Sequence, residues 1–179
     1  MTATNERKSW LNLIKAVDSN GWETDPNQLF EYEVKIETEV EQNIFFSVRG
    51  DGENYLAGVT TTATEWVNSN NQTYYYFASG STITLKIKAG WSVRFLNLDD
   101  ESEYTIKEVN IPDGYVLESS NSVETLYVDR VLNPATGRYE SVAADGYPKT
   151  TTFDTVTVSG TINQTNTDYT VNYTNKYLG

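Results

Sequence analysis

Apolar and polar residues alternate along most of the chain, the pattern of β-strands that bury one face and expose the other. The clearest example spans residues 30–37, where aromatic and aliphatic side chains alternate with glutamates and a lysine. Residues 83–88 alternate in the same way, and no stretch beyond Ser9 has a convincing helical period. We therefore predict an all-β protein, with further strands at 11–17, 44–49, 73–78, 93–98, 104–109, 155–158 and 169–177.

Two segments depart from this pattern. Residues 1–9 are polar, and we expect them to be a disordered lead-in or an addition to the natural chain. Residues 121–153 carry several turn signals around short strands near Leu126 and Tyr139, which indicates a long hairpin insertion. The strand spacing favours one immunoglobulin-like β-sandwich over residues 10–179, with this insertion inside it.

Charge and composition exclude several classes of function. The formal net charge is −12, from 13 basic and 25 acidic residues, so we expect no binding to nucleic acid or anionic membrane surfaces. The chain has no cysteine and no histidine, which excludes thiol catalysis, disulfides, the usual zinc sites and serine–histidine triads. No apolar run is long enough to span a membrane. We expect no cofactor, no metal site and no turnover enzyme, because no pair of acids is marked by its spacing as a glycosidase pair.

Three polar residues fall on strand faces that otherwise carry core residues. Strand alternation puts Lys15 in register with Leu13 and Val17, and it puts Glu108 in register with Tyr104 and Ile106. It also puts Asn175 on the face of Val171, Tyr173 and Tyr177. Burying these groups is costly unless they are paired, so we expect them to meet in the core.

Such a trio can also react. In an apolar core a lysine is readily neutral and a carboxylic acid readily protonated. The protonated acid would then hydrogen-bond the carboxamide and polarise its carbonyl, and the neutral amine would attack it while the acid shuttles protons and ammonia leaves. The product is an amide cross-link that is made once.

The segments that carry these residues resemble a known family. Residues 104–115, Tyr-Thr-Ile-Lys-Glu-Val-Asn-Ile-Pro-Asp-Gly-Tyr, resemble the acid-containing signature of the collagen-adhesin B-type (CnaB-like) domains of Gram-positive pilins and surface adhesins. Residues 171–177 are similar to the last strand of those domains, and residues 13–17 and 30–34 are similar to their first strands. The resemblance covers most of the chain outside 121–153 and implies a CnaB-type immunoglobulin-like sandwich.

The resemblance also implies roles for individual residues. Lys15 and Asn175 would form an isopeptide bond, and Glu108 would be the catalytic acid. Lys8 is the alternative lysine if the first strand begins earlier, although its distance to Phe30 is long for the family. A bond between the first and last strands would let pulling force pass without unravelling the strands between them.

The function implied is that of a structural stalk or pilin-type domain of a cell-wall-anchored surface adhesin. Its location would be the cell surface of a Gram-positive bacterium, as a monomeric part of a larger protein whose neighbouring domains are its partners. The alternative is a ligand-binding adhesin module that holds a host protein or glycan through the insertion or through an aromatic cluster that includes Tyr74, Tyr75, Tyr76 and Trp66.

Overall fold

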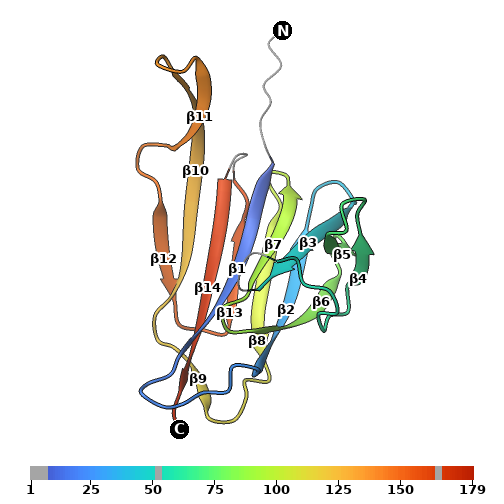
Figure 1. The fold of residues 1–179 in the computed structure, drawn as a ribbon, viewed down its shortest axis with the longest axis vertical. Helices are drawn as coiled ribbons and strands as arrows, with labels where there is room; N and C mark the ends of the chain where they lie inside the picture. Colours follow the sequence, from blue (N-terminus) through green and yellow to red (C-terminus); the bar gives the residue numbers. More distant parts are fainter. Residues whose placement is uncertain (1–7, 51–53, 164–166) are drawn as a thin grey trace.

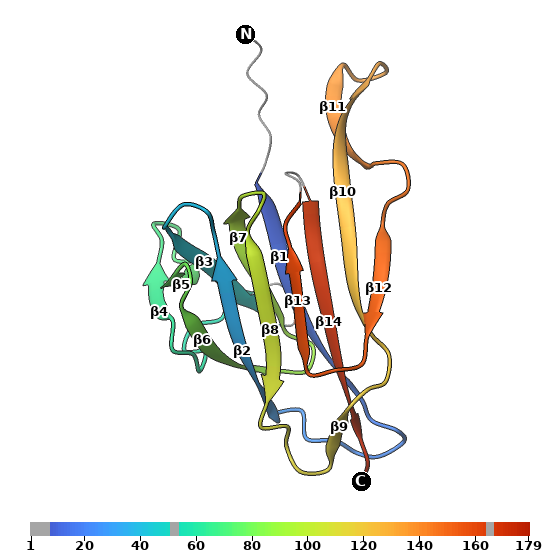
Figure 2. The same cartoon turned by 180° about the vertical axis from the view of Figure 1, so that it is seen from behind.

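Two β-sheets pack face to face in the computed structural model, which describes residues 8–50, 54–163 and 167–179 (Figures 1 and 2). The larger sheet has ten strands in the order β11-β10-β14-β1-β7-β3-β5-β4, with β12 also paired to β10 and β9 to β14. The smaller sheet has the order β13-β8-β2-β6. The prediction of an all-β, immunoglobulin-like sandwich is confirmed.

The strands of the larger sheet are β1 (Ser9–Asp18), β3 (Asn43–Arg49), β4 (Thr64–Val67), β5 (Thr73–Ala78), β7 (Ser92–Leu98), β9 (Tyr115–Leu117), β10 (Asn121–Asn133), β11 (Arg138–Ala143), β12 (Lys149–Phe153) and β14 (Thr167–Tyr177). Those of the smaller sheet are β2 (Leu29–Glu37), β6 (Thr82–Lys88), β8 (Glu103–Val109) and β13 (Thr157–Thr161).

The first and last strands lie side by side and run parallel in the middle of the larger sheet. Their register pairs Leu13 with Val171 and Val17 with Asn175. Because they are parallel, β1 begins at one end of the molecule and β14 ends at the other (Figure 1). A force applied to the two ends of the chain would therefore shear these two strands past each other.

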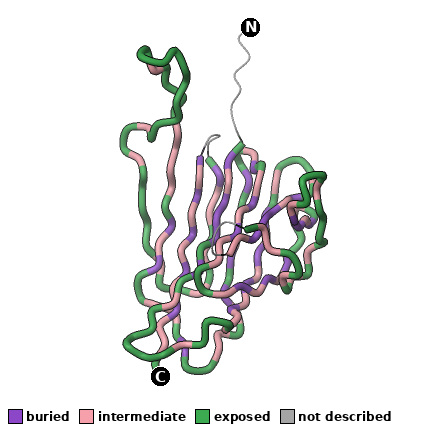
Figure 3. The backbone as a smooth tube through the Cα atoms, in the orientation of Figure 1, coloured by how far each residue is buried: buried purple, intermediate pink, exposed green. Residues whose placement is uncertain are grey.

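The core lies between the inward faces of the two sheets, where the buried residues of Figure 3 concentrate. Aromatic side chains join the sheets across it. The Tyr32 ring of β2 meets the Tyr173 ring of β14 edge to face, with centroids 5.0 Å apart. The Tyr173 hydroxyl also donates to the Ile106 carbonyl of β8 at 3.0 Å, which satisfies a buried polar group.

The predicted insertion corresponds to β10, β11 and β12. The first half of β10 pairs with both β14 and β12, and its second half pairs with β11 alone. The β10–β11 hairpin therefore projects beyond the sandwich as a two-stranded ribbon, exposed over most of its length (Figures 1 and 3). The strands expected near Leu126 and Tyr139 both form.

Some boundaries differ from those predicted. Ser9 was assigned to the lead-in, but it is the first residue of β1 and is fully buried. Its hydroxyl accepts a hydrogen bond from the Thr167 backbone amide at 3.2 Å, so this buried polar group has a partner. Residues 1–7 of that lead-in lie outside the described residues. Strand β4 was missed because it is an edge strand with all four residues exposed, so it has no apolar alternation. In the described part of the chain, no helix is long and apolar enough to cross a membrane.

Candidate cross-linking site

Three strands from both sheets bring Lys15, Glu108 and Asn175 together in the core. Lys15 and Asn175 come from the adjacent strands β1 and β14, and Glu108 faces them from β8 of the smaller sheet. Strand alternation turns each of these side chains inward, and their relative exposures are 1%, 2% and 0% respectively. The three polar residues that the sequence pattern assigned to core faces therefore contact one another.

Glu108 bridges the other two side chains. Its Oε2 lies 3.2 Å from the Lys15 amine, and its Oε1 accepts a hydrogen bond from Asn175 Nδ2 at 2.8 Å. The Lys15 amine is also in close contact with Asn175 Oδ1. The amine, the carboxyl group and the carboxamide form a closed triangle.

The surroundings of this triangle are aromatic. The Lys15 amine lies 4.3 Å from the centroid of the Phe30 ring and 5.7 Å from that of Tyr32. Burial lowers the pKa of Lys15 from 10.5 to about 8, although the charge of Glu108 and the hydrogen bond to it act in the opposite direction. A substantial share of this lysine is therefore neutral, and so nucleophilic, near pH 8.

Tyr32 is a fourth member of the site that the sequence pattern did not single out. Its hydroxyl donates a 2.8 Å hydrogen bond to Glu108 Oε2, the same oxygen that faces the lysine. Burial, together with the charge of Glu108, raises the pKa of Tyr32 well above its ordinary value, so the hydroxyl remains a donor. In the sequence Tyr32 looks like any other inward-facing aromatic residue. The one available signal is general: a buried tyrosine hydroxyl usually has a hydrogen-bond partner, so a polar group was to be expected near it.

The orientation of the carboxamide differs from the one expected. The acid was expected to hydrogen-bond the amide so as to polarise its carbonyl, but Glu108 instead accepts from the amide nitrogen. The carboxyl group thus lies between the attacking nitrogen and the leaving nitrogen. That position suits a group that takes a proton from one nitrogen and delivers it to the other.

The alternative lysine lies elsewhere. Lys8 precedes β1, and its amine is 3.0 Å from Asp99 Oδ1, with 49% of its side chain exposed. The lysine that contacts both Glu108 and Asn175 is Lys15. Within the described residues, no group of three or more acidic side chains is arranged to hold a metal ion.

The fold and the buried trio define the class of this protein: an immunoglobulin-like sandwich whose terminal strands meet at a lysine, an acid and an asparagine. No protein-family model and no curated protein matches the chain. Among solved structures, the major pilin from Streptococcus pyogenes matches 96% of this chain at 14% identity, with a TM-score of 0.56. A variant of that pilin gives a TM-score of 0.57 at 15% identity.

A second major pilin from Streptococcus pyogenes, T3.2, matches 96% of this chain at 14% identity with a TM-score of 0.54. The chain spans about half the length of these pilins, 48% of the first and 45% of the second. The protein shares the fold of part of a streptococcal major pilin.

Proposed function

We propose that this protein is a stalk or pilin-type domain of a Gram-positive surface protein, of CnaB type, locked by an isopeptide bond between Lys15 and Asn175. The observation that carries the proposal is the buried triangle of Lys15, Glu108 and Asn175, which joins the first strand to the last. Unpaired, such groups would destabilise a core, whereas placed together they are the reactants and the proton carrier of an amide exchange.

The reaction balances without a cofactor. The neutral amine of Lys15 attacks Cγ of Asn175 and forms a new C–N bond, and its proton passes to Glu108. The carboxyl group then delivers that proton to Nδ2, the old C–N bond breaks and ammonia leaves. Glu108 returns to its starting state, and the domain cannot react again because its amine and carboxamide have been consumed.

Tyr32 supports this chemistry by fixing the carboxyl group. Its hydrogen bond to Glu108 Oε2 orients the oxygen that faces the amine. The aromatic rings exclude water, which strengthens each of these polar contacts.

The bond would also suit a domain under tension. Parallel terminal strands are sheared when the ends of the chain are pulled, and the cross-link would route force from β1 directly into β14. The span between the bonded residues is 160 positions, so most of the domain would carry no load. A chain without cysteine has no disulfide to perform this task.

The likeness in fold to streptococcal major pilins supports the location on the cell surface, in line with the acidic composition. The partners would be neighbouring domains of the same surface protein, and the only chemistry would be the single self-cross-linking event. The domain would act as a monomer.

The test is the intact mass of the purified protein beside that of Glu108→Ala. We expect the wild type to be lighter than its calculated mass by one ammonia and the variant to have its full mass. Glu103→Ala is the matched control, because Glu103 lies on the same strand but faces solvent. Peptide mapping should recover a branched peptide that contains Lys15 and Asn175. A wild type of full calculated mass would overturn the proposal.

A second candidate function, ligand binding, is supported by an aromatic surface on the outer face of the larger sheet. Tyr75 faces the core, whereas its neighbours Tyr74 and Tyr76 turn outward and pack with Trp66 and Phe45. An open groove of about 350 Å³ lies there, lined in part by Phe45, Trp66 and Tyr74. Tyr74→Ala should abolish binding on a glycan or matrix-protein array if this groove holds a ligand, and the mass of the protein should not change.

A further inference from the structure

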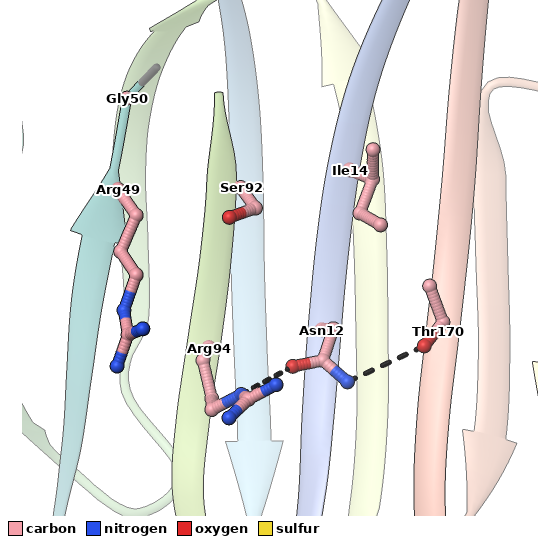
Figure 4. A pocket seen from close by; sticks show the side chains of 7 residues that line it. All are labelled: Asn12, Ile14, Arg49, Gly50, Ser92, Arg94 and Thr170. Atoms are coloured by element: carbon pink, nitrogen blue, oxygen red, sulfur yellow. Dashed lines mark hydrogen bonds between the residues drawn. The ribbon is translucent and has the colours of Figure 1, made fainter. Parts of the chain in front are cut away.

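A second pocket lies on the outer face of the larger sheet, on the side of β1 opposite to the cross-linking site. It has a volume of about 250 Å³ and is built from side chains of four strands, β1, β3, β7 and β14 (Figure 4). These strands are hydrogen-bonded neighbours in the order β14-β1-β7-β3, so the floor of the pocket is continuous sheet. The side chains that matter here are Asn12, Ile14, Arg49, Ser92, Arg94 and Thr170.

The charge of this pocket is opposite to that of the protein. The chain carries 25 acidic residues against 13 basic ones, yet the described residues that line the pocket include two arginines and no acid. Arg49 and Arg94 stand on adjacent strands, and each guanidinium lies against an aromatic ring. The pocket is therefore a local cationic site on an acidic molecule, which favours an anionic ligand.

Arg49 retains unused hydrogen-bonding capacity. One terminal nitrogen donates to the Tyr55 hydroxyl at 2.7 Å, and the guanidinium carbon lies 4.5 Å from the centre of that ring. Its Nε is buried and has no hydrogen-bond partner, and within the described residues it forms no ion pair with an acid. An unsatisfied donor of a charged group is costly, and among the described residues Arg49 has no acidic partner.

Arg94 is held in place by a network that crosses three strands. Its Nε donates to Asn12 Oδ1 at 2.9 Å, and Asn12 Nδ2 donates to Thr170 Oγ1 at 3.3 Å (Figure 4). The guanidinium also stacks 4.1 Å from the centre of the Trp10 ring. The Arg94 side chain is therefore already oriented before any ligand binds, which reduces the conformational entropy lost on binding.

We propose that this pocket binds the carboxylate of an acidic sugar, such as a uronic or sialic acid. Guanidinium groups match the planar, two-oxygen geometry of a carboxylate. The hydroxyl groups of Ser92 and Thr170 would serve the ring hydroxyls, and the small volume suits one acidic ring of a longer glycan. The inference does not depend on the cross-link.

The position of the pocket argues against an acidic peptide. An extended peptide gains affinity by pairing its backbone with a free sheet edge. Strands β1, β7 and β3 each have a neighbour on both sides, so no free edge borders this pocket. Recognition there has to come from side chains alone, as it does for a sugar.

The test is a titration of the whole protein, followed by NMR chemical shifts and by calorimetry, with sodium glucuronate and N-acetylneuraminate. Glucose is the neutral counterpart, and sodium acetate and a glutamate-rich peptide are the non-sugar carboxylates. We expect saturable shifts at Asn12, Ser92 and Thr170 with at least one acidic sugar. Arg49→Gln should weaken that affinity at least about tenfold, which is about 1.4 kcal/mol.

Two further variants complete the test. Arg138→Gln removes the same charge on the exposed ribbon and should bind as the wild type does. Arg94→Lys keeps the charge but loses the planar fork, and it should also weaken binding. Thermal melting shows whether each variant is folded. The proposal is overturned by the absence of saturable binding, by unchanged affinity in folded Arg49→Gln, or by equal affinity for glucose, acetate or the peptide.

Discussion

We expect the replacement of Glu108 by glutamine and Lys15 by methionine in one protein to remove the proposed cross-link while keeping side chains of similar size. The double change is preferable to either single one, because removing only one partner of the buried Lys15–Glu108 ion pair would leave the other charge unpaired. The difference in stability between the double variant and the wild type should then come mainly from the loss of the covalent link.

The magnitude follows from the loop that the link closes. Lys15 and Asn175 are 160 positions apart, and closing a loop of that length would remove about 5 kcal/mol of unfolded-state conformational entropy by the relation used for disulfides. For a domain of 179 residues each kcal/mol corresponds to about 2–4 °C of melting temperature. We therefore expect the double variant to melt about 10–20 °C below the wild type.

The assay is differential scanning calorimetry, together with the rate of trypsin digestion at a temperature between the two midpoints. Glu103→Gln serves as the control, since it removes an exposed carboxylate of β8 and should leave both readouts unchanged. A double variant of full mass that melts within about 3 °C of a cross-linked wild type would refute the entropy argument. The cross-link would then stabilise the domain against force alone.

Other consequences are open to direct measurement. Tyr32→Phe removes the hydrogen bond that fixes the acid and should slow bond formation at least about tenfold, followed by mass spectrometry as unreacted chain, produced and kept in denaturant, folds for the first time beside wild-type chain treated in the same way; an unchanged rate would deny it a positioning role. The rate in wild type should rise with pH up to about 8 and then level off, because Lys15 reacts as the neutral amine and its pKa is lowered to about 8; a flat profile would contradict this. In Asn175→Ala, which cannot cross-link, the unfolded state binds more protons than the folded state above the lowered pKa of Lys15. Its free energy of unfolding by urea should therefore increase from pH 8 to 9, a range that stays below the ionisation of tyrosines in the unfolded chain, whose raised pKa values in the folded state, as at Tyr32, act in the opposite direction. A decrease over that range would count against a neutral buried lysine. Gly160→Ala would place a Cβ 2.6 Å from the Tyr104 hydroxyl and should cost about 1–3 kcal/mol in urea unfolding, whereas wild-type stability would mean that the ring can move aside.

Much of the fold could be read from the two-residue period of the strands. The period assigned Lys15, Glu108 and Asn175 to inward faces, and these side chains are buried as expected. The long hairpin was visible from its turn residues, and β10 to β12 occupy its span. Strands β4 and β9 carry too few inward-facing residues to produce a pattern, so they were not predicted.

The two-residue period did not predict which inward-facing side chains contact one another in the core. The sequence favoured Lys15 and left Lys8 open as the alternative, and in the structure Lys8 lies on the surface beside Asp99 whereas Lys15 lies against Glu108. It also gave no reason to separate Tyr32 from the other core aromatics.

The sequence pattern gave no indication of the pocket on the outer face of the larger sheet. Arg49 and Arg94 are 45 positions apart in the sequence and look like ordinary solvent-facing residues of two strands, until the β3–β7 pairing puts them on one surface. A strand's period depends only on its own residues, because it reports which side of one strand is buried. Which strands become neighbours, and in which register, depends on contacts between distant segments, and these contacts build both the buried triangle and the cationic pocket.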